Sequence, residues 1–172
     1  HVLQWRARVR YVRQQGGIGL PKTPVETLAA LLALRAQRGR LRLPEARAAL
    51  DAAMDELGLA RALLEQPWST LSGGESQRVY LCLNLALKPD VLLLDEVTSG
   101  CDETSALLVE KLVAQSGAAV IWISHDSRQV SRLGQSVLEH ATRDGVSLAE
   151  EEAGLPARTG AEPSDAPESG AR

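Results

Sequence analysis

The chain has 172 residues, a formal net charge of −3 and a pI near 5.7, which suits one domain with a sizeable core. Arginine is frequent, but this charge balance gives no sign of a nucleic-acid-binding surface. Cys82 and Cys101 stand apart from each other and from histidine, so the sequence suggests neither a metal site nor a disulfide framework. The absence of an 18-residue apolar run and of a signal-peptide pattern argues against a membrane-spanning segment in this chain.

The first part of the chain combines a short strand with helices. Residues 1–24 hold a strand-like run at 9–12 and a Gly/Pro-rich loop. Residues 25–66 are rich in Ala, Leu and Arg. This pattern predicts two or three amphipathic helices, with breaks near Gly39 and Gly58.

The second part alternates helix and strand. Within residues 67–142 we expect helices at 72–87 and 103–115 and buried strands at 91–94 and 119–123. Two short apolar strands joined by a helix of this length imply a parallel α/β unit. Residues 143–172 shift to Glu, Ala, Gly, Pro and Ser, which is typical of a disordered tail.

The stretch at residues 16–23, GGIGLPKT, nearly matches the phosphate-loop pattern G-x-x-x-x-G-K-[ST]. It also lies between a predicted strand and a predicted helix. It departs from the pattern at Pro21, where the second glycine belongs, and proline lacks the N–H group that a phosphate cradle uses. We therefore interpret this stretch as a connecting loop.

The stretch at residues 71–78, LSGGESQR, opens a predicted helix and allows two interpretations. In the first, Ser72 and Glu75 form a capping box and nothing more. In the second, Gly73 and Gly74 allow the backbone to approach an anion at the helix N-terminus. Each glycine costs the helix roughly 1 kcal/mol relative to alanine. The stretch is therefore a possible phosphate site, better built than GGIGLPKT.

The run at residues 91–96, VLLLDE, describes a buried strand that delivers Asp95 and Glu96 at its carboxyl end, where ligands bind in parallel sheets. An Asp there can hold Mg²⁺ and a Glu can polarise an attacking water. The alternative is a strand that ends in a charged turn. His125 follows the next strand, so we expect it at the same edge, beside Glu96, with a functional imidazole rather than a structural one.

Four motifs in this order resemble those of ABC-type ATPases. LSGGESQR resembles the signature motif and VLLLDE the Walker B strand, while residues 99–102 (SGCD) resemble the D-loop and residues 123–126 (ISHD) the switch-histidine segment. The spacing fits as well, with steps of 23, 7 and 23 residues along the series Ser72, Asp95, Asp102 and His125. The resemblance covers roughly residues 5–140.

The resemblance implies the α/β fold of ABC-type phosphate-loop NTPases, present in part as a parallel sheet core plus a helical subdomain. Residues 10–14, RYVRQ, look like the segment that leads into the Q-loop, with Gln14 as its glutamine. GGIGLPKT then falls just after the Q-loop. The Walker A loop should lie before Gln14, and nothing in residues 1–13 matches it. We therefore expect a chain that lacks roughly 70–90 N-terminal residues and is inactive alone.

By the same resemblance, the subunit binds ATP and Mg²⁺ and works as a head-to-tail dimer with a second ABC ATPase subunit. Asp95 would help to hold Mg²⁺, Gln14 would sense Mg²⁺ and water, Glu96 would act as the base and His125 would contact the γ-phosphate. The signature residues would close over the partner's ATP, and Asp102 would link the two sites. The residues implied in ATP binding are Gln14, Ser72, Gly73, Gly74, Glu75 and Asp102.

A transmembrane permease is the other implied partner, and it would hold the chain at the cytoplasmic face of a membrane. WRARVRYVRQQ, NLALKPDVLLLDEVTSGCDE and VIWISHD are similar to ATP-binding subunits of bacterial iron exporters and of plant half-transporters linked to aluminium tolerance. That similarity implies metal-ion export, with no nucleic acid involved. Two alternatives stay open: a soluble ABC ATPase in translation or DNA repair, and a non-hydrolysing remnant that acts as a regulatory or interaction module.

Overall fold

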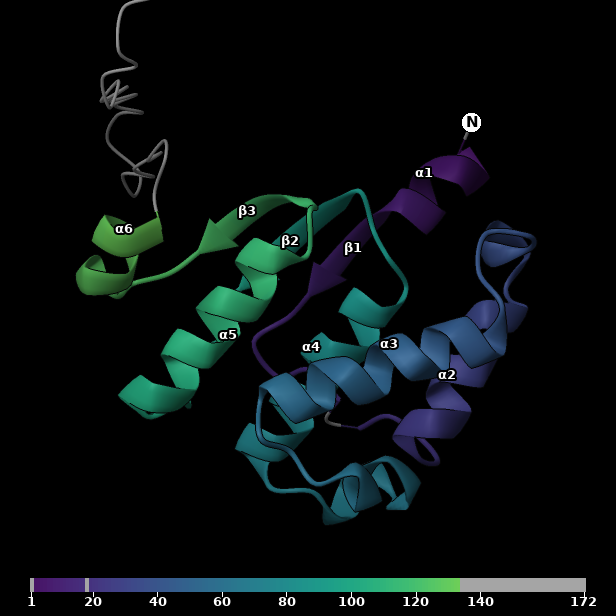
Figure 1. The fold of residues 1–172 in the computed structure, drawn as a ribbon, viewed down its shortest axis with the longest axis horizontal. Coiled ribbons are helices and arrows are strands. Elements are labelled where there is room, and N and C mark those ends of the chain that lie inside the picture. Colours follow the sequence, from purple (N-terminus) through teal and green to yellow (C-terminus); the bar gives the residue numbers. More distant parts are fainter. Residues whose placement is uncertain (1, 18, 134–172) are drawn as a thin grey trace, which may run out of the picture. The chain divides into compact units, whose positions relative to one another are not determined.

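The structure is a computed structural model that describes residues 2–17 and 19–133 (Figure 1). The chain divides into two units, residues 1–129 and 130–172, and the second is described only over residues 130–133. The tail predicted at 143–172 lies outside the described residues. No helix within the described part is both long enough and apolar enough to cross a membrane.

A three-stranded parallel sheet, in the order β1-β2-β3, lies in the first unit. The strands are β1 (Val9–Val12), β2 (Val91–Asp95) and β3 (Ala119–Ile123), and Val91 pairs with both Val9 and Ala119. Parallel neighbours need long crossover connections, which helices provide here. The connection from β2 to β3 is α5 (Glu103–Gln115), as the sequence predicted.

Three α-helices connect β1 to β2, and α2 and α3 both pack against α4 (Figure 1). They are α2 (Pro24–Ala33), α3 (Leu43–Glu56) and α4 (Gly73–Ala86). The 3-10 helices between them are η1 (Arg35–Gln37), η2 (Arg61–Glu65) and η3 (Trp68–Thr70). Gly39 and Gly58 have φ values of +76° and +62° at the breaks, a conformation that glycine adopts without strain. Two or three helices with breaks near these glycines were predicted, whereas the boundary of a helical subdomain at residue 66 stays a prediction.

Two short helices were not predicted. The helix α1 (Val2–Arg8) leads directly into β1, where the sequence suggested only a strand and a loop. The helix α6 (Ser127–Leu133) follows the switch-histidine segment. Each has seven residues, too few for an apolar periodicity to stand out in the sequence.

The strand β3 pairs with β2 as predicted, but the expectation that it is buried is wrong. Val120, Ile121 and Ile123 are 38%, 61% and 52% exposed, whereas Leu92 and Leu94 of β2 are almost fully buried. The strand β2 lies between two strands, while β3 is an edge of the described sheet and no described strand pairs with its outer side. An apolar run predicts burial only where another element covers it.

The apolar core is one cluster that joins the sheet to the helices. Val12 and Leu92 from the strands, Met54 from α3 and Leu83 from α4 are all fully buried. Burial of a side chain of this size contributes about 1.5–3 kcal/mol. Trp68 adds an edge-to-face contact with Tyr80, at 6.3 Å between ring centroids, and its indole N–H donates to Thr27 Oγ1 at 2.9 Å.

The GGIGLPKT stretch ends by starting a helix. Thr23 forms a capping box with Glu26, in which Thr23 N donates to Glu26 Oε2 at 3.0 Å and Glu26 N to Thr23 Oγ1 at 3.3 Å. Pro24 then occupies the first helical position, where its missing N–H is harmless. Lys22 is exposed, and its carbonyl accepts from Trp68 N. The contacts of Thr23 and Lys22 therefore support a connecting loop.

The glycines of this stretch let the loop pack against α4 and its neighbours. A Cβ at Gly16 would lie 2.3 Å from Tyr80 Cδ1, and one at Gly17 would lie 2.4 Å from Ser76 Oγ and 2.5 Å from Trp68 Cζ3. Gly17 also has φ +81°. Gly19 has a similar φ of +76° but no described atom within 4 Å of an added Cβ.

These three glycines form a graded test of stability. We expect Gly19→Ala to lower the free energy of unfolding by about 1 kcal/mol through backbone strain alone. Gly16→Ala should cost about 2 kcal/mol through overpacking, and Gly17→Ala, which combines both effects, about 3 kcal/mol or more. Urea unfolding measures the series. Equal losses at Gly17 and Gly19 would show that the loop does not pack closely on Ser76 and Trp68.

Candidate functional site

The carboxyl ends of the three strands meet at one edge of the sheet, because all three run parallel. Asp95 ends β2 and pairs with Ile123, the last residue of β3. Glu96 and His125 therefore follow neighbouring strands at the same edge, as predicted. Gln14 lies in the turn after β1, with its side chain exposed. Ligands of open parallel sheets bind at this edge.

The backbone of Glu96 is held in a left-handed conformation, with φ +51°. Its N–H donates to the carbonyl of Ile123 at 3.1 Å. Its carbonyl accepts from Gln77 Nε2 at 3.1 Å and from Ser99 Oγ at 2.9 Å. Because a residue with a Cβ pays about 1–2 kcal/mol in this conformation, these contacts are needed to keep Glu96 in place.

The side chain of Glu96 faces His125. Its carboxylate is 16% exposed, and Oε1 lies 3.7 Å from His125 Nε2. This oxygen is buried and has no hydrogen-bond partner among the described residues. A separation of 3.7 Å is too long for a direct hydrogen bond but lies within ion-pair distance. A carboxylate at the ligand-binding edge of a parallel sheet is a candidate general base.

Asp95 is half-buried, and its Oδ2 accepts a hydrogen bond from Tyr11 Oη at 2.7 Å. The hydrogen bond to Asp95 raises the pKa of Tyr11, so the phenol stays protonated and keeps donating. Tyr11 was not predicted as a site residue. It pairs with Leu93, two residues before Asp95, so a diagonal contact across parallel strands could have suggested it.

The oxygen groups of this edge suit Mg²⁺ bound together with a phosphate. Within the described ranges, no cluster of three or more His, Cys, Asp or Glu side chains could hold an ion. Asp95 and Gln14 could supply one or two oxygen ligands. Mg²⁺ in phosphate-transferring sites commonly takes one or two carboxylates and completes its shell with water and substrate phosphates.

The N-terminus of α4 contains the capping box that the sequence allowed. Ser72 N donates to Glu75 Oε2 at 2.9 Å, Ser72 Oγ donates to the same oxygen at 2.6 Å, and Glu75 N donates to Ser72 Oγ at 3.3 Å. The hydrogen bonds from Ser72 lower the pKa of Glu75. The cap explains both of these residues without any ligand.

The capping box does not explain the two glycines that lie inside it. A Cβ added to Gly73 would meet no described atom within 4 Å. At Gly74 it would meet Arg78 Nη1 at 3.7 Å and Gly100 O at 3.9 Å, which are ordinary van der Waals distances. Neither glycine has a positive φ. The fold of the described chain therefore accepts alanine at both positions, and free space remains in front of the helix N-terminus.

Buried polar side chains connect α4 to the sheet edge. Gln77, which is 9% exposed, binds the carbonyl of Glu96, and Ser76, which is 1% exposed, donates from Oγ to the carbonyl of Gly16 at 3.1 Å. These contacts join the signature helix to the Walker B residues and to the loop after Gln14. Neither Ser76 nor Gln77 was predicted as a site residue, because only the folded packing reveals their partners.

Asp102 caps α5. Its Oδ1 accepts from Ser105 N at 2.9 Å and its Oδ2 from Ser105 Oγ at 2.7 Å, and these hydrogen bonds lower the pKa of Asp102. Within the described residues, Asp102 and Gln14 make no hydrogen bond or ion pair with Glu96 or His125. The structure thus brings Glu96, which follows Asp95, close to His125, whereas Asp102 follows Glu96 by six residues and Gln14 follows the neighbouring strand β1.

A buried polar cluster holds the segments that flank Glu96 and His125. Gln129 Nε2 donates to Glu110 Oε1 at 2.9 Å and to Thr98 Oγ1 at 3.0 Å. Gln129 and Glu110 are 2% and 5% exposed. Thr98 lies two residues after Glu96 and Gln129 four residues after His125, so the cluster fixes both segments against α5.

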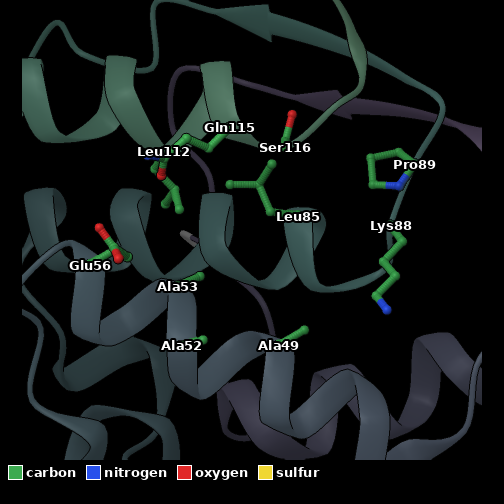
Figure 2. Close-up of a pocket in the computed structure, with 10 residues that line it drawn as sticks. All are labelled: Ala49, Ala52, Ala53, Glu56, Leu85, Lys88, Pro89, Leu112, Gln115 and Ser116. Carbon is green, nitrogen blue, oxygen red and sulfur yellow. The ribbon is translucent and has the colours of Figure 1, made fainter.

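An open groove of about 280 Å³ lies elsewhere in the unit, between α3 and the ends of α4 and α5 (Figure 2). Pro89, just before β2, and Ser116, before β3, line it, so it is at the amino end of the sheet. None of the residues predicted to bind ATP or metal lines this groove. The candidate site at Asp95, Glu96 and His125 therefore lies at the opposite edge of the sheet.

Comparison with known proteins identifies relatives of this chain. Residues 1–99 match the family model described as ABC transporter. The chain is 35% identical over 82 residues to the probable iron export ATP-binding protein FetA of Escherichia coli (strain K12). The matched stretch is 45% of this chain and 36% of FetA. It is 43% identical over 83 residues to the zinc import ATP-binding protein ZnuC of Yersinia enterocolitica. That matched stretch is 46% of this chain and 33% of ZnuC. The matches thus span about a third of these curated relatives.

A solved structure extends the likeness beyond the matched sequence. The dimeric ATP-binding cassette MJ0796, in a post-hydrolysis state bound to ADP and Pi, superposes with a TM-score of 0.65 at 25% identity. The superposition covers 78% of this chain and 60% of that cassette. It confirms the predicted α/β cassette fold. Since the family model also matches more than half of the 172 residues, the chain belongs to the ABC transporter family.

Proposed function

We propose that this chain is part of an ATP-binding and ATP-hydrolysing subunit that powers an ABC-type membrane transporter. The observation that carries the proposal is the Glu96–His125 pair, with a buried, unpartnered carboxylate oxygen 3.7 Å from an imidazole nitrogen. Glu96 follows β2 and His125 follows β3, which pairs with β2. Both residues therefore lie at the carboxyl edge of the parallel sheet, where ligands bind. A strand that merely ended in a charged turn would leave its carboxylates in solvent.

Each predicted residue has a role that its position supports. Glu96 accepts a proton from the attacking water, and His125 donates a hydrogen bond to the γ-phosphate. Asp95, oriented by Tyr11, would hold Mg²⁺ together with Gln14 from the turn after β1. Mg²⁺ supplies charge stabilisation to the transferred phosphoryl group when it is bound.

We infer the partners from the N-terminus of α4, which would supply one half of a nucleotide site. Gly73 and Gly74 leave open space beside the capped N-terminus of α4, and a helix N-terminus favours an anion. We propose that this end closes over ATP held by a second subunit in a head-to-tail dimer, with Asp102 between the two sites. A permease would then place the subunit at the cytoplasmic face of a membrane.

A metal ion is the proposed cargo. FetA is named for iron export and ZnuC for zinc import, so the two names agree on a metal ion and differ in direction. We propose export, following the resemblance of the Walker B and D-loop stretch to iron-exporter subunits. Inside-out membrane vesicles containing the complete transporter would test this: ATP-driven accumulation of iron inside the vesicles supports export, and ATP-driven loss of preloaded iron would contradict it.

The prediction for catalysis concerns Glu96 in a polypeptide that contains residues 1–172 together with a family phosphate loop. Glu96→Gln should keep ATP binding and lower phosphate release by at least about 100-fold, because the amide cannot accept the proton. The ATP-bound dimer should then accumulate, which gel filtration detects. Glu103→Gln, the same change at an exposed position in α5, is the matched control and should hydrolyse ATP normally. Wild-type turnover by Glu96→Gln would remove Glu96 from the role of base.

A further prediction distinguishes a role of the LSGGE signature in ATP hydrolysis from a role as a helix cap alone. Because the chain leaves room for a Cβ at Gly74, Gly74→Ala should keep or raise the melting temperature, by up to about 1 kcal/mol of stability. The added methyl should obstruct approach to the partner's nucleotide and lower ATPase activity by at least about tenfold, or near 1.4 kcal/mol. ATP should still bind to the protomer's own phosphate loop.

A matched control for this prediction is Ser69→Ala, at an exposed position three residues before the cap. It should leave both stability and turnover unchanged. If Gly74→Ala is as active as Ser69→Ala, the motif serves only as a helix cap. Residues 1–172 alone provide the background rate and should release no phosphate, since no described Lys and glycine loop replaces Walker A.

A further inference from the structure

The bend between α2 and α3 concentrates positive charge on one short segment, residues 34–43, which we call the Arg-rich bend. From residue 27 to residue 44 the sequence has four arginines and no Asp or Glu, in a chain with a net charge of −3. All four are exposed. They are Arg35, Arg38, Arg40 and Arg42.

Exposed apolar side chains accompany this charge. Leu34 and Leu43, at the two ends of the Arg-rich bend, are 51% and 49% exposed. The helix α1 lies beside η1 and adds Trp5, which is 61% exposed, and the exposed Arg6. Four of the nine exposed large apolar residues in the described part of the chain are therefore on these two segments, the fourth being Val2.

The Arg-rich bend is an ordered part of the fold with distinct inner and outer sides. Gln37 is 2% exposed, and Leu41 packs against the core. The N–H of Gln37 donates to the carbonyl of Leu34 at 2.9 Å, and the N–H of Arg40 to the carbonyl of Gln37 at 3.1 Å. Gly39, with φ +76°, reverses the chain between them. The arginines are thus presented by a fixed turn.

Little negative charge within the protein neutralises this surface. Asp90 pairs with Arg8 of α1 and lies 3.9 Å from Arg40, so one carboxylate serves two guanidinium groups. Arg35 and Arg38 have no ion-pair partner among the residues that the structure describes. Their charge is available to an anion from outside the protein.

We propose that the Arg-rich bend, with the adjoining α1, binds the surface of an anionic phospholipid membrane. Guanidinium groups pair with lipid phosphates, and clusters of four or more basic residues bind anionic leaflets. Exposed Leu and Trp side chains enter the boundary between headgroups and acyl chains. A nucleic acid would match the charge but would leave the leucines without an apolar environment. This surface goes beyond the proposed ATPase and needs no ATP.

The test measures binding of the purified protein to sedimented vesicles. We expect binding to vesicles with about 30 mol% phosphatidylglycerol and none to pure phosphatidylcholine. The double variant Arg35→Gln/Arg38→Gln should bind at least about tenfold more weakly. The matched control Arg47→Gln/Arg61→Gln removes the same charge from arginines already paired with Asp51, Glu65 and Asp55, and should bind like the wild type.

A second pair of substitutions tests the apolar component. Leu34→Ser/Leu43→Ser should keep part of the binding at low salt and lose it at about 0.5 M salt, where exposed charges are screened within about 4–5 Å. Circular dichroism and melting curves confirm that each variant folds. Equal binding to neutral vesicles, no vesicle binding, or no effect of the arginine double variant would overturn the proposal. Tighter binding of a DNA oligonucleotide or of polyglutamate would overturn it in favour of nucleic acid or an acidic protein.

Discussion

Hydrogen bonds on both sides of Glu96 fix the residue that follows the central strand. Its N–H is bound to β3 and its carbonyl to α4 through Gln77, while φ stays at +51°. A residue with a side chain keeps this conformation only where its surroundings over-determine it. The direction of the Glu96 carboxylate and its distance from His125 follow from this backbone position. The helix α4 begins at the LSGGE motif, and Gln77 in its second turn donates to the carbonyl of Glu96. The start of α4 and the sheet edge that carries Glu96 are therefore packed together.

Much of the fold was predictable because local signals and tertiary packing agree. The limits of α5 and β3 match the predicted ones because Asp102 caps the helix and Gly117 ends it. The exposure of β3 was not predictable, since the same apolar run would be buried under any covering layer. The close approach of Gly16 and Gly17 to α4 was also hidden, because a glycine pair in sequence looks the same whether it serves a turn, a phosphate or a packing contact.

The site was predictable where motifs carry it and not where contacts do. Asp95, Glu96 and His125 were expected together because parallel strands share a carboxyl edge. Tyr11 follows from the register of β1 and β2, whereas Gln129 acts through a tertiary contact that no spacing in the sequence encodes. The signature shows that two interpretations can hold at once. Ser72 and Glu75 build a helix cap, and the glycines between them leave its front open, so a stable helix start and an anion site can use the same four residues.

The exposed apolar face of β3 bears on how the chain behaves before it is assembled. Among the described residues no strand pairs with the outer side of β3, where Val120, Ile121 and Ile123 are exposed, and such edges drive self-association when nothing covers them. We expect the solubility of the polypeptide during synthesis to depend on how soon a neighbouring strand covers β3. A defect along this edge would therefore first impair proteostasis, as aggregation of the protein, before it affects catalysis.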